Sequence, residues 1–237
     1  MLLADRIVVI TGASAGIGAA TARAASARGA TTVLVARTEA KLRELAAELP
    51  RAHAFAADAS DEAAVARLCE QVMATVGKPD VIVNNAGAGR FLRLEETSPA
   101  EFLEMTSAPY LAAAFVTRAF LPAMIERDSG WIVNVNSPIS RMTWPGAAGY
   151  AGGRWALRGF TEALRMDLRG SGIGVSEVIP GKVSSEYFEH NPGAEERIPD
   201  IAKLLRTLTP AQAAEGILRA IEREQRELVL QQSCTIS

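Results

Sequence analysis

Short runs of apolar residues alternate with longer helical patterns along most of the 237-residue chain. The apolar runs are rich in Val, Ile and Leu and lack polar alternation, which is typical of parallel strands covered on both faces. Seven strands are predicted in this way, at Arg6–Thr11, Thr31–Ala36, Ala52–Ala56, Asp80–Val83, Trp131–Asn136, Gly174–Ile179 and Glu227–Leu230.

Between the strands, the spacing of apolar residues predicts amphipathic helices. These helices are expected at Gly16–Arg28, Glu39–Leu49, Asp61–Val76, Pro99–Glu126, Tyr150–Arg169 and Ala211–Glu224. Repeated strand–helix units form right-handed crossovers and a doubly wound parallel sheet of the α/β class. The chain has no linker, internal repeat or low-complexity tract, so one domain is expected over residues 1–237, with a loop beside the ligand at Ser184–Thr207.

Composition narrows the class of protein. The chain holds 25 Lys and Arg against 27 Asp and Glu, a balance that argues against binding to nucleic acid or to an anionic membrane. No apolar run reaches the ~20 residues of a membrane span, and no secretory signal pattern is found. Two histidines and two cysteines are too few for a zinc site or a disulfide framework. We therefore expect a cytoplasmic protein without a metal.

A glycine-rich turn follows the first predicted strand. Gly12, Gly16 and Gly18 stand between the end of that strand and the first helical pattern. Glycines let the backbone turn sharply and let a pyrophosphate approach the N–H groups at a helix N-terminus. A strand before the turn and a helix after it are the context that a nucleotide-binding turn requires.

The segment TGASAGIG at Thr11–Gly18 resembles the TGxxxGxG cofactor motif of the short-chain dehydrogenase/reductase family, and further matches follow in the family's order. They are NNAG at Asn84–Gly87, Ser137, Tyr150 thirteen residues later, and PG at Pro180–Gly181. The resemblance covers nearly the whole chain and implies a Rossmann fold of about seven parallel strands, an NAD(P) cofactor and hydride transfer. The cofactor contacts that it implies are Gly12, Ser14, Ala15, Gly16, Ile17, Gly18, Asp58, Ala59, Asn84, Ala86, Gly87, Tyr150, Arg154, Pro180, Gly181, Val183 and Ser185.

The end of the second predicted strand indicates which cofactor is used. The strand ends at Ala36, without the acidic residue that binds the adenosine ribose in NAD sites. Arg37 follows and suits a bidentate contact with a 2′-phosphate, although a solvated loop cation is the alternative. NADP(H) is therefore the predicted cofactor.

Two of the other implied contacts carry an alternative. Asp58 resembles the family's adenine contact, although on its own it would more often cap a helix. In NNAG, Asn84 is expected to pack over the adenosine half of the cofactor, while Asn85 braces the strands.

Carbonyl reduction needs a proton donor beside the hydride, and the resemblance gives this role to Tyr150, with Ser137 holding the substrate oxygen. Tyrosine has an unperturbed pKa of about 10, so the family places a Lys four residues later, one helical turn away. Arg154 stands there in this chain, and it is permanently charged but cannot join a proton relay. The Asn that completes the relay in the family is replaced by Pro109, which frees a backbone carbonyl inside a helix.

Three functions remain open at this point. The first is an NADP(H)-dependent oxidoreductase that transfers a hydride between nicotinamide and a ketone or alcohol, with Ser137, Tyr150 and Arg154 as its catalytic residues. Pro109 and Arg154 favour a rival, a nucleotide-binding sensor or scaffold without turnover. The third is imine reduction or dehydration on the same fold.

Two further expectations concern partners. Apolar side chains near the predicted site favour a hydrophobic small molecule, and they belong to Phe91, Met142, Trp144, Tyr187 and Phe188. In the family, the helices that correspond to Pro99–Glu126 and Tyr150–Arg169 pair across a two-fold interface, so a homodimer or homotetramer is expected.

Overall fold

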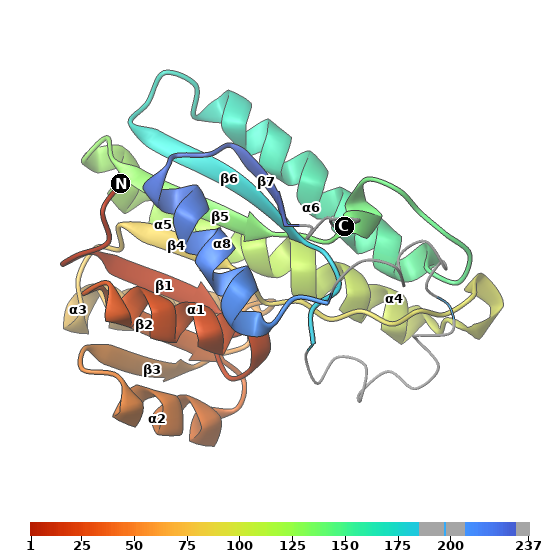
Figure 1. Ribbon diagram of the computed structural model, residues 1–237, viewed down its shortest axis with the longest axis horizontal. Coiled ribbons are helices and arrows are strands. Elements are labelled where there is room, and N and C mark those ends of the chain that lie inside the picture. Colours follow the sequence, from red (N-terminus) through yellow and green to blue (C-terminus); the bar gives the residue numbers. More distant parts are fainter. Residues whose placement is uncertain (185–196, 198–206, 231–237) are drawn as a thin grey trace, which may run out of the picture.

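The computed structural model describes residues 1–184, 197 and 207–230, and within them seven parallel strands form one sheet (Figure 1). The strand order is β3-β2-β1-β4-β5-β6-β7. The strands are β1 (Ile7–Thr11), β2 (Thr31–Ala36), β3 (Ala52–Ala56), β4 (Val81–Asn84), β5 (Gly130–Val135), β6 (Ile173–Pro180) and β7 (Glu227–Leu230). From β1 the chain builds outward to β2 and β3, and it then returns to β4 on the other side of β1. The predicted doubly wound α/β fold is therefore confirmed.

Helices cover both faces of this sheet (Figure 1). Within β1, Val8 and Ile10 face one apolar cluster while Val9 faces the other, which explains why the strand has no polar alternation. One face carries α1 (Gly16–Ala27), α2 (Glu39–Glu48) and α8 (Pro210–Glu222). The opposite face carries α3 (Glu62–Thr75), α5 (Ala112–Glu126) and α6 (Ala148–Asp167).

The predicted helix Pro99–Glu126 is not continuous. It consists of α4 (Pro99–Thr106), a turn of π-helix named η2 (Ser107–Leu111) and α5. Pro109 is buried inside η2 and has no N–H, so it cannot donate to the carbonyl of Met105 four residues earlier. The helix widens by one residue at this point, a common response to a missing hydrogen bond.

The carbonyl of Met105 lies directly against α6. A Cβ atom added to Gly153 would overlap the oxygen of Met105 and would lie 3.2 Å from Cγ of Pro109. Gly149, one turn earlier, is equally close to the side chain of Met105. The backbone of α6 therefore touches α4 and η2, and the absence of a side chain at Gly153 allows this close approach beside Pro109. Gly152, in contrast, faces open space.

By length and composition, the stretch Pro99–Glu126 could cross a membrane, with a mean hydropathy of 1.4 in its most apolar window. Glu101, Glu104 and Arg118 interrupt the stretch, so the sequence holds no continuous apolar run there. In the structure Val116, Phe120 and Met124 of α5 are fully buried against the sheet, as in a core helix. The absence of a membrane span stays a prediction.

The two adjacent glycines of α6 offer a matched test of this packing. We expect Gly153→Ala to lower the free energy of unfolding by about 1–3 kcal/mol, because the added Cβ meets a backbone oxygen that cannot move independently. We expect Gly152→Ala to raise it by about 0.5–1 kcal/mol, because alanine favours a helix and nothing opposes its Cβ. Urea unfolding of both variants measures the difference, and equal stabilities would contradict the close contact.

Candidate active site

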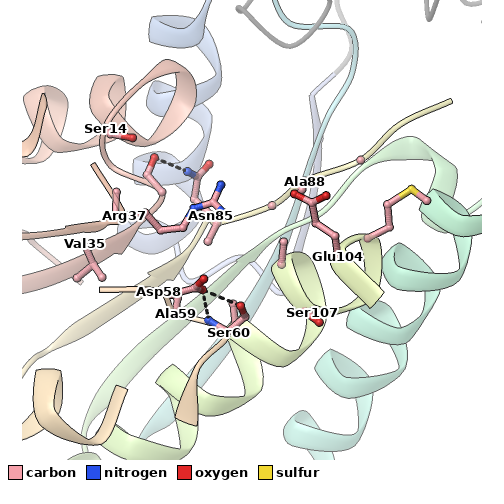
Figure 2. Close-up of a pocket in the computed structure, with 18 of the residues that line it drawn as sticks. Ser14, Val35, Arg37, Asp58, Ala59, Ser60, Asn85, Ala88, Glu104 and Ser107 are labelled. Atoms are coloured by element: carbon pink, nitrogen blue, oxygen red, sulfur yellow. Dashed lines mark hydrogen bonds between the residues drawn. The ribbon is translucent and has the colours of Figure 1, made fainter. Parts of the chain in front are cut away.

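A cavity of about 840 Å³ opens at the carboxyl ends of the central strands (Figure 2). Its walls come from the turns after β1, β2, β3 and β4 and from the helical stretch α4–η2. The connections from β1 and β4 run in opposite directions here, and such a switch point is where open α/β sheets bind ligands. The position agrees with the one expected for a nucleotide.

The glycine turn forms one wall of the cavity. Gly12 and Gly16 have φ angles of 65° and 53°, in the left-handed region that suits glycine. A Cβ on Gly18 would overlap the carbonyl oxygen of Gly12, so α1 starts in contact with the turn. Ala15 caps α1 without a side-chain hydrogen bond, and the first turn holds no acidic residue. The N–H groups at this helix end can therefore bind phosphate, and the turn fits a pyrophosphate.

Both asparagines of NNAG brace the strands, and only Asn85 also lines the cavity. Asn84 is buried, does not line the cavity, and donates to Thr117 on α5 at 3.0 Å and to Asn134 on β5 at 2.8 Å. Asn85 lines the cavity, and its amide donates to the carbonyl of Thr11 at 3.0 Å. Asn84 thus braces the strands as Asn85 does, and its interpretation as a cofactor contact is corrected. Alternation along β4 turns it inward, so the next residue faces the cavity.

Arg37 and Asp58 lie at one end of the cavity (Figure 2). Asp58 accepts hydrogen bonds from the hydroxyl of Ser60 at 2.6 Å and from its backbone N–H at 2.8 Å. These bonds, together with the nearby charge of Arg37, lower the pKa of Asp58. Asp61 caps α3 instead, by accepting from Ala64. Asp58 therefore stays ionised between the guanidinium and the start of α3.

The opposite wall of the cavity was missed by the sequence analysis. Figure 2 shows Glu104 and Ser107 on this wall, and both belong to the helical stretch α4–η2. An ion pair between Arg90 and Glu101 lies at the same end. No motif marks these positions, because which side of α4 faces the cavity depends on the turn of π-helix that follows.

Tyr150 lies behind this cavity rather than in its wall. Its side chain is 8% exposed, and its ring meets Phe91 edge-on at a centroid distance of 5.5 Å. A Cβ on Gly89 would overlap the ring. Residues 87–90 line the cavity on their other side, so the loop of residues 87–91 separates Tyr150 from the cavity.

Arg154 packs across the same loop. Its guanidinium carbon lies 5.2 Å from the centroid of the Tyr150 ring, and Nη1 donates to the carbonyl of Val135 at 3.0 Å. A Cβ on Gly87 would lie 2.6 Å from Nη2. The positive charge expected one turn after Tyr150 is therefore present, over the face of the ring and beside the end of β5.

Ser137 follows β5 and begins a short 3₁₀-helix, η3 (Pro138–Ser140). This segment is fixed to α6, the helix that carries Tyr150. The indole of Trp155 donates to the carbonyl of Ile139 at 2.8 Å, and Arg158 donates to that of Ser140 at 3.1 Å. The positions of Ser137 and Tyr150 are thus coupled through η3.

The implied cofactor contacts fall into two groups, those that line the cavity and those that do not. Those that line the cavity are Gly12, Ser14, Ala15, Gly16, Ile17, Arg37, Asp58, Ala59, Ala86 and Gly87. Those described but outside its lining are Gly18, Asn84, Tyr150, Arg154, Pro180, Gly181 and Val183. After β6, the N–H of Gly181 donates to Leu230, and Val183 pairs with Leu208. Ser185, like Tyr187 and Phe188, lies outside the described residues.

Comparison with known proteins places this arrangement in a family. The model of the short chain dehydrogenase family matches residues 6–195. The chain is 34% identical over 212 residues to sulfoacetaldehyde reductase 2 of Chromohalobacter salexigens, a match that covers 87% of this chain and 83% of that protein. It is 31% identical over 236 residues to the probable oxidoreductase EphD of Mycobacterium bovis, covering 93% of this chain.

The match covers 40% of EphD, so the chain spans less than half the length of that relative. Among solved structures, an alcohol dehydrogenase from the archaeon Thermococcus sibiricus, complexed with 5-hydroxy-NADP, has a TM-score of 0.84. It is 30% identical, and the match covers 95% of this chain and 96% of that one.

Proposed function

The chain belongs to the short-chain dehydrogenase family of oxidoreductases, and we propose that it transfers a hydride between NADP(H) and a small hydrophobic ketone or alcohol. One observation carries this proposal. The glycine turn and Arg37 line a cavity whose opposite boundary, the loop of residues 87–91, contacts both Tyr150 and Arg154. A cofactor in the cavity would thus reach from a phosphate-binding helix end to the loop that covers the tyrosine.

The residues present fit an NADP molecule. The N–H groups at the start of α1 would hold the pyrophosphate. Arg37 would pair with the 2′-phosphate, and Ala36 offers no carboxylate that would bind the ribose hydroxyls of NAD instead. When bound, the nicotinamide supplies the hydride. Tyr150 then donates its proton to the substrate oxygen, and the hydroxyl of Ser137 donates a hydrogen bond to the same oxygen. Arg154 holds a positive charge over the ring of Tyr150, whose hydroxyl gives up the proton.

The substrate class follows from the surroundings of Tyr150. Phe91 lies between Tyr150 and Trp144, with its ring centroid 5.7 Å from that of Trp144. Because these side chains cover the tyrosine, substrate binding includes a shift of the loop of residues 87–91, and an apolar molecule replaces the lost contacts best. The relative named as a sulfoacetaldehyde reductase supports reduction of a carbonyl group.

Turnover is tested with NADPH and three carbonyl probes, 4-nitrobenzaldehyde, acetophenone and cyclohexanone. We expect NADPH oxidation with at least one probe, and Tyr150→Phe to lower kcat by about a hundredfold or more, because it removes the proton donor. Tyr110→Phe is the matched control and should keep its activity, since Tyr110 does not line the cavity and its ring packs on Phe160. Tight NADPH binding without oxidation of any probe would favour the scaffold function instead.

The cofactor preference is tested by binding. We expect NADPH to bind about tenfold more tightly than NADH or better, because a charge-assisted pair with the 2′-phosphate contributes roughly 1.5–3 kcal/mol. Arg37→Ala should remove the preference. Arg43→Ala should keep it, because Arg43 pairs with Glu39 on the exposed side of α2. Fluorescence titration measures the affinity of the wild type and both variants for each cofactor, six values in all, and a preference that survives in Arg37→Ala would refute the assignment.

We also propose that the protein is a homodimer or homotetramer that pairs through α5 and α6. An apolar groove of about 290 Å³ runs between these helices, lined by Ala114, Thr117, Arg118, Leu121, Pro122, Ile125, Phe160 and Leu164. Ile125, one of these lining residues, is 56% exposed. Exposed apolar side chains around a groove are typical of an interface between identical subunits.

The assembly is tested by light scattering at micromolar protein concentration. We expect a dimer or tetramer for the wild type and dissociation in Ile125→Lys, because the lysine charge would be buried against a second copy. Leu2→Lys is the control, since Leu2 is 81% exposed and does not line the groove. A monomeric wild type would rule out this interface.

A further inference from the structure

We propose that Glu177, on β6, is a positioning residue that acts through Asn136 to hold Ser137 and Arg154 in place. The inference rests on the proposed function, because it assigns these two residues to the reaction. Glu177 is fully buried, and nothing in its strand position requires a charge. A buried carboxylate is costly unless it is paired and hydrogen-bonded, so its partners define its role.

The first partner is Asn136, which stands between β5 and Ser137. Its Nδ2 donates to Oε1 of Glu177 at 2.6 Å and to the backbone carbonyl of Arg154 at 3.2 Å. Its Oδ1 accepts from the backbone N–H of Ser137 at 2.9 Å. One buried amide therefore touches both the residue that would hold the substrate oxygen and the helix that carries Tyr150.

These bonds allow only one orientation of the Asn136 amide. If the amide turned over, its oxygen would face the carboxylate of Glu177 and the carbonyl of Arg154, and its NH₂ would face the N–H of Ser137. All three contacts would become repulsive, because each would pair two donors or two acceptors. The shortest of the three bonds is the one to the charged partner, as expected of a charge-assisted bond. Glu177 is thus the group that fixes the amide.

The second partner is Arg141, at the end of the segment that begins with Ser137. Its Nη2 lies 2.6 Å from Oε2 of Glu177, and it also pairs with Glu227 on β7. The carboxylate therefore binds this segment on both sides of η3, through Asn136 at one end and Arg141 at the other. Ser137 lies between two points that are tied to β6.

Stability alone does not explain this arrangement. Replacement of both members of a buried ion pair by apolar residues often leaves a protein as stable as before, so a pair of this kind is not required for the fold. Glu177 does not reach the cavity, so it does not bind the cofactor or the substrate directly. What it supplies is a fixed orientation for Asn136, and in a variant that remains folded the loss of Glu177 should appear in the reaction step rather than in cofactor binding.

The experiment compares Glu177→Leu, Glu177→Gln and Glu227→Gln. The leucine removes the bond between Asn136 and residue 177, whereas the glutamine keeps an acceptor for Asn136. Glu227→Gln weakens Arg141 at its other partner only. Kinetics with NADPH and the best carbonyl probe give kcat and KM, thermal unfolding gives Tm, and hydrogen–deuterium exchange reports on residues 136–142.

We expect Glu177→Leu to lower kcat by about tenfold to a hundredfold, the effect of a small misplacement of reacting groups, with KM for NADPH within about twofold. Exchange at residues 136–142 should rise. Tm should also fall, because the leucine leaves an N–H of the buried Asn136 amide without its acceptor, so the kinetics are measured well below the Tm of the variant. Glu177→Gln should recover most of kcat, and Glu227→Gln should match the wild type in both readouts.

A folded Glu177→Leu with unchanged kcat would overturn the proposal, as would a loss of kcat without faster exchange at residues 136–142. If the wild type oxidises NADPH with no probe, the proposed function fails, and the exchange measurement still decides whether Glu177 holds Ser137. Unchanged exchange would then refute the positioning role by itself.

Discussion

Side-chain amides join the carboxyl ends of the four central strands, and the walls of the cavity depend on them. The amides belong to Asn84, Asn85, Asn134 and Asn136. They link β1 to β4, β4 to β5 and β5 to β6, and two of them also bind hydroxyls on α5 and α6. A buried amide that loses its partner is costly, so each strand end is fixed relative to its neighbour. The residues of the candidate site follow the carboxyl ends of the strands, and these hydrogen bonds fix the positions of those ends.

The sheet and most helices could be predicted from the sequence because their signals are local. Strands covered on both faces are continuous apolar runs, and β2, β3 and β7 lie where the runs do. Where ends differ, they differ by one or two residues. The turn of π-helix could not be located in this way. Pro109 predicts a freed carbonyl, which is that of Met105. The residue that packs against this carbonyl is Gly153, which lies 44 residues after Pro109 and meets it only in the folded chain.

The candidate site was predicted in part, and the misses have a common cause. The glycine turn, Arg37 and Asp58 line the cavity as a motif suggests, since each directly follows a strand. Asn85 braces β4 against β1 as expected, but Asn84 was wrongly assigned to the cofactor, because strand alternation decides which of two neighbours faces inward. The covering of Tyr150 by a loop, and the α4 wall, depend on packing between distant segments. Sequence patterns report the strand ends well and the contacts between them poorly.

Arg154 illustrates how one departure from a family pattern depends on its surroundings. A lysine offers a single flexible ammonium group, whereas arginine presents a planar fork that needs acceptors in fixed places. Here the carbonyl of Val135 accepts from the fork, and the Asn136 amide holds the backbone carbonyl of the same arginine. The last residue of β5 and the one after it therefore bind both ends of Arg154. A lysine at this position would keep the second contact and lose the geometry of the first. The exchange of Lys for Arg is thus matched by the way β5 ends, and β5 is in turn held by the buried carboxylate of Glu177.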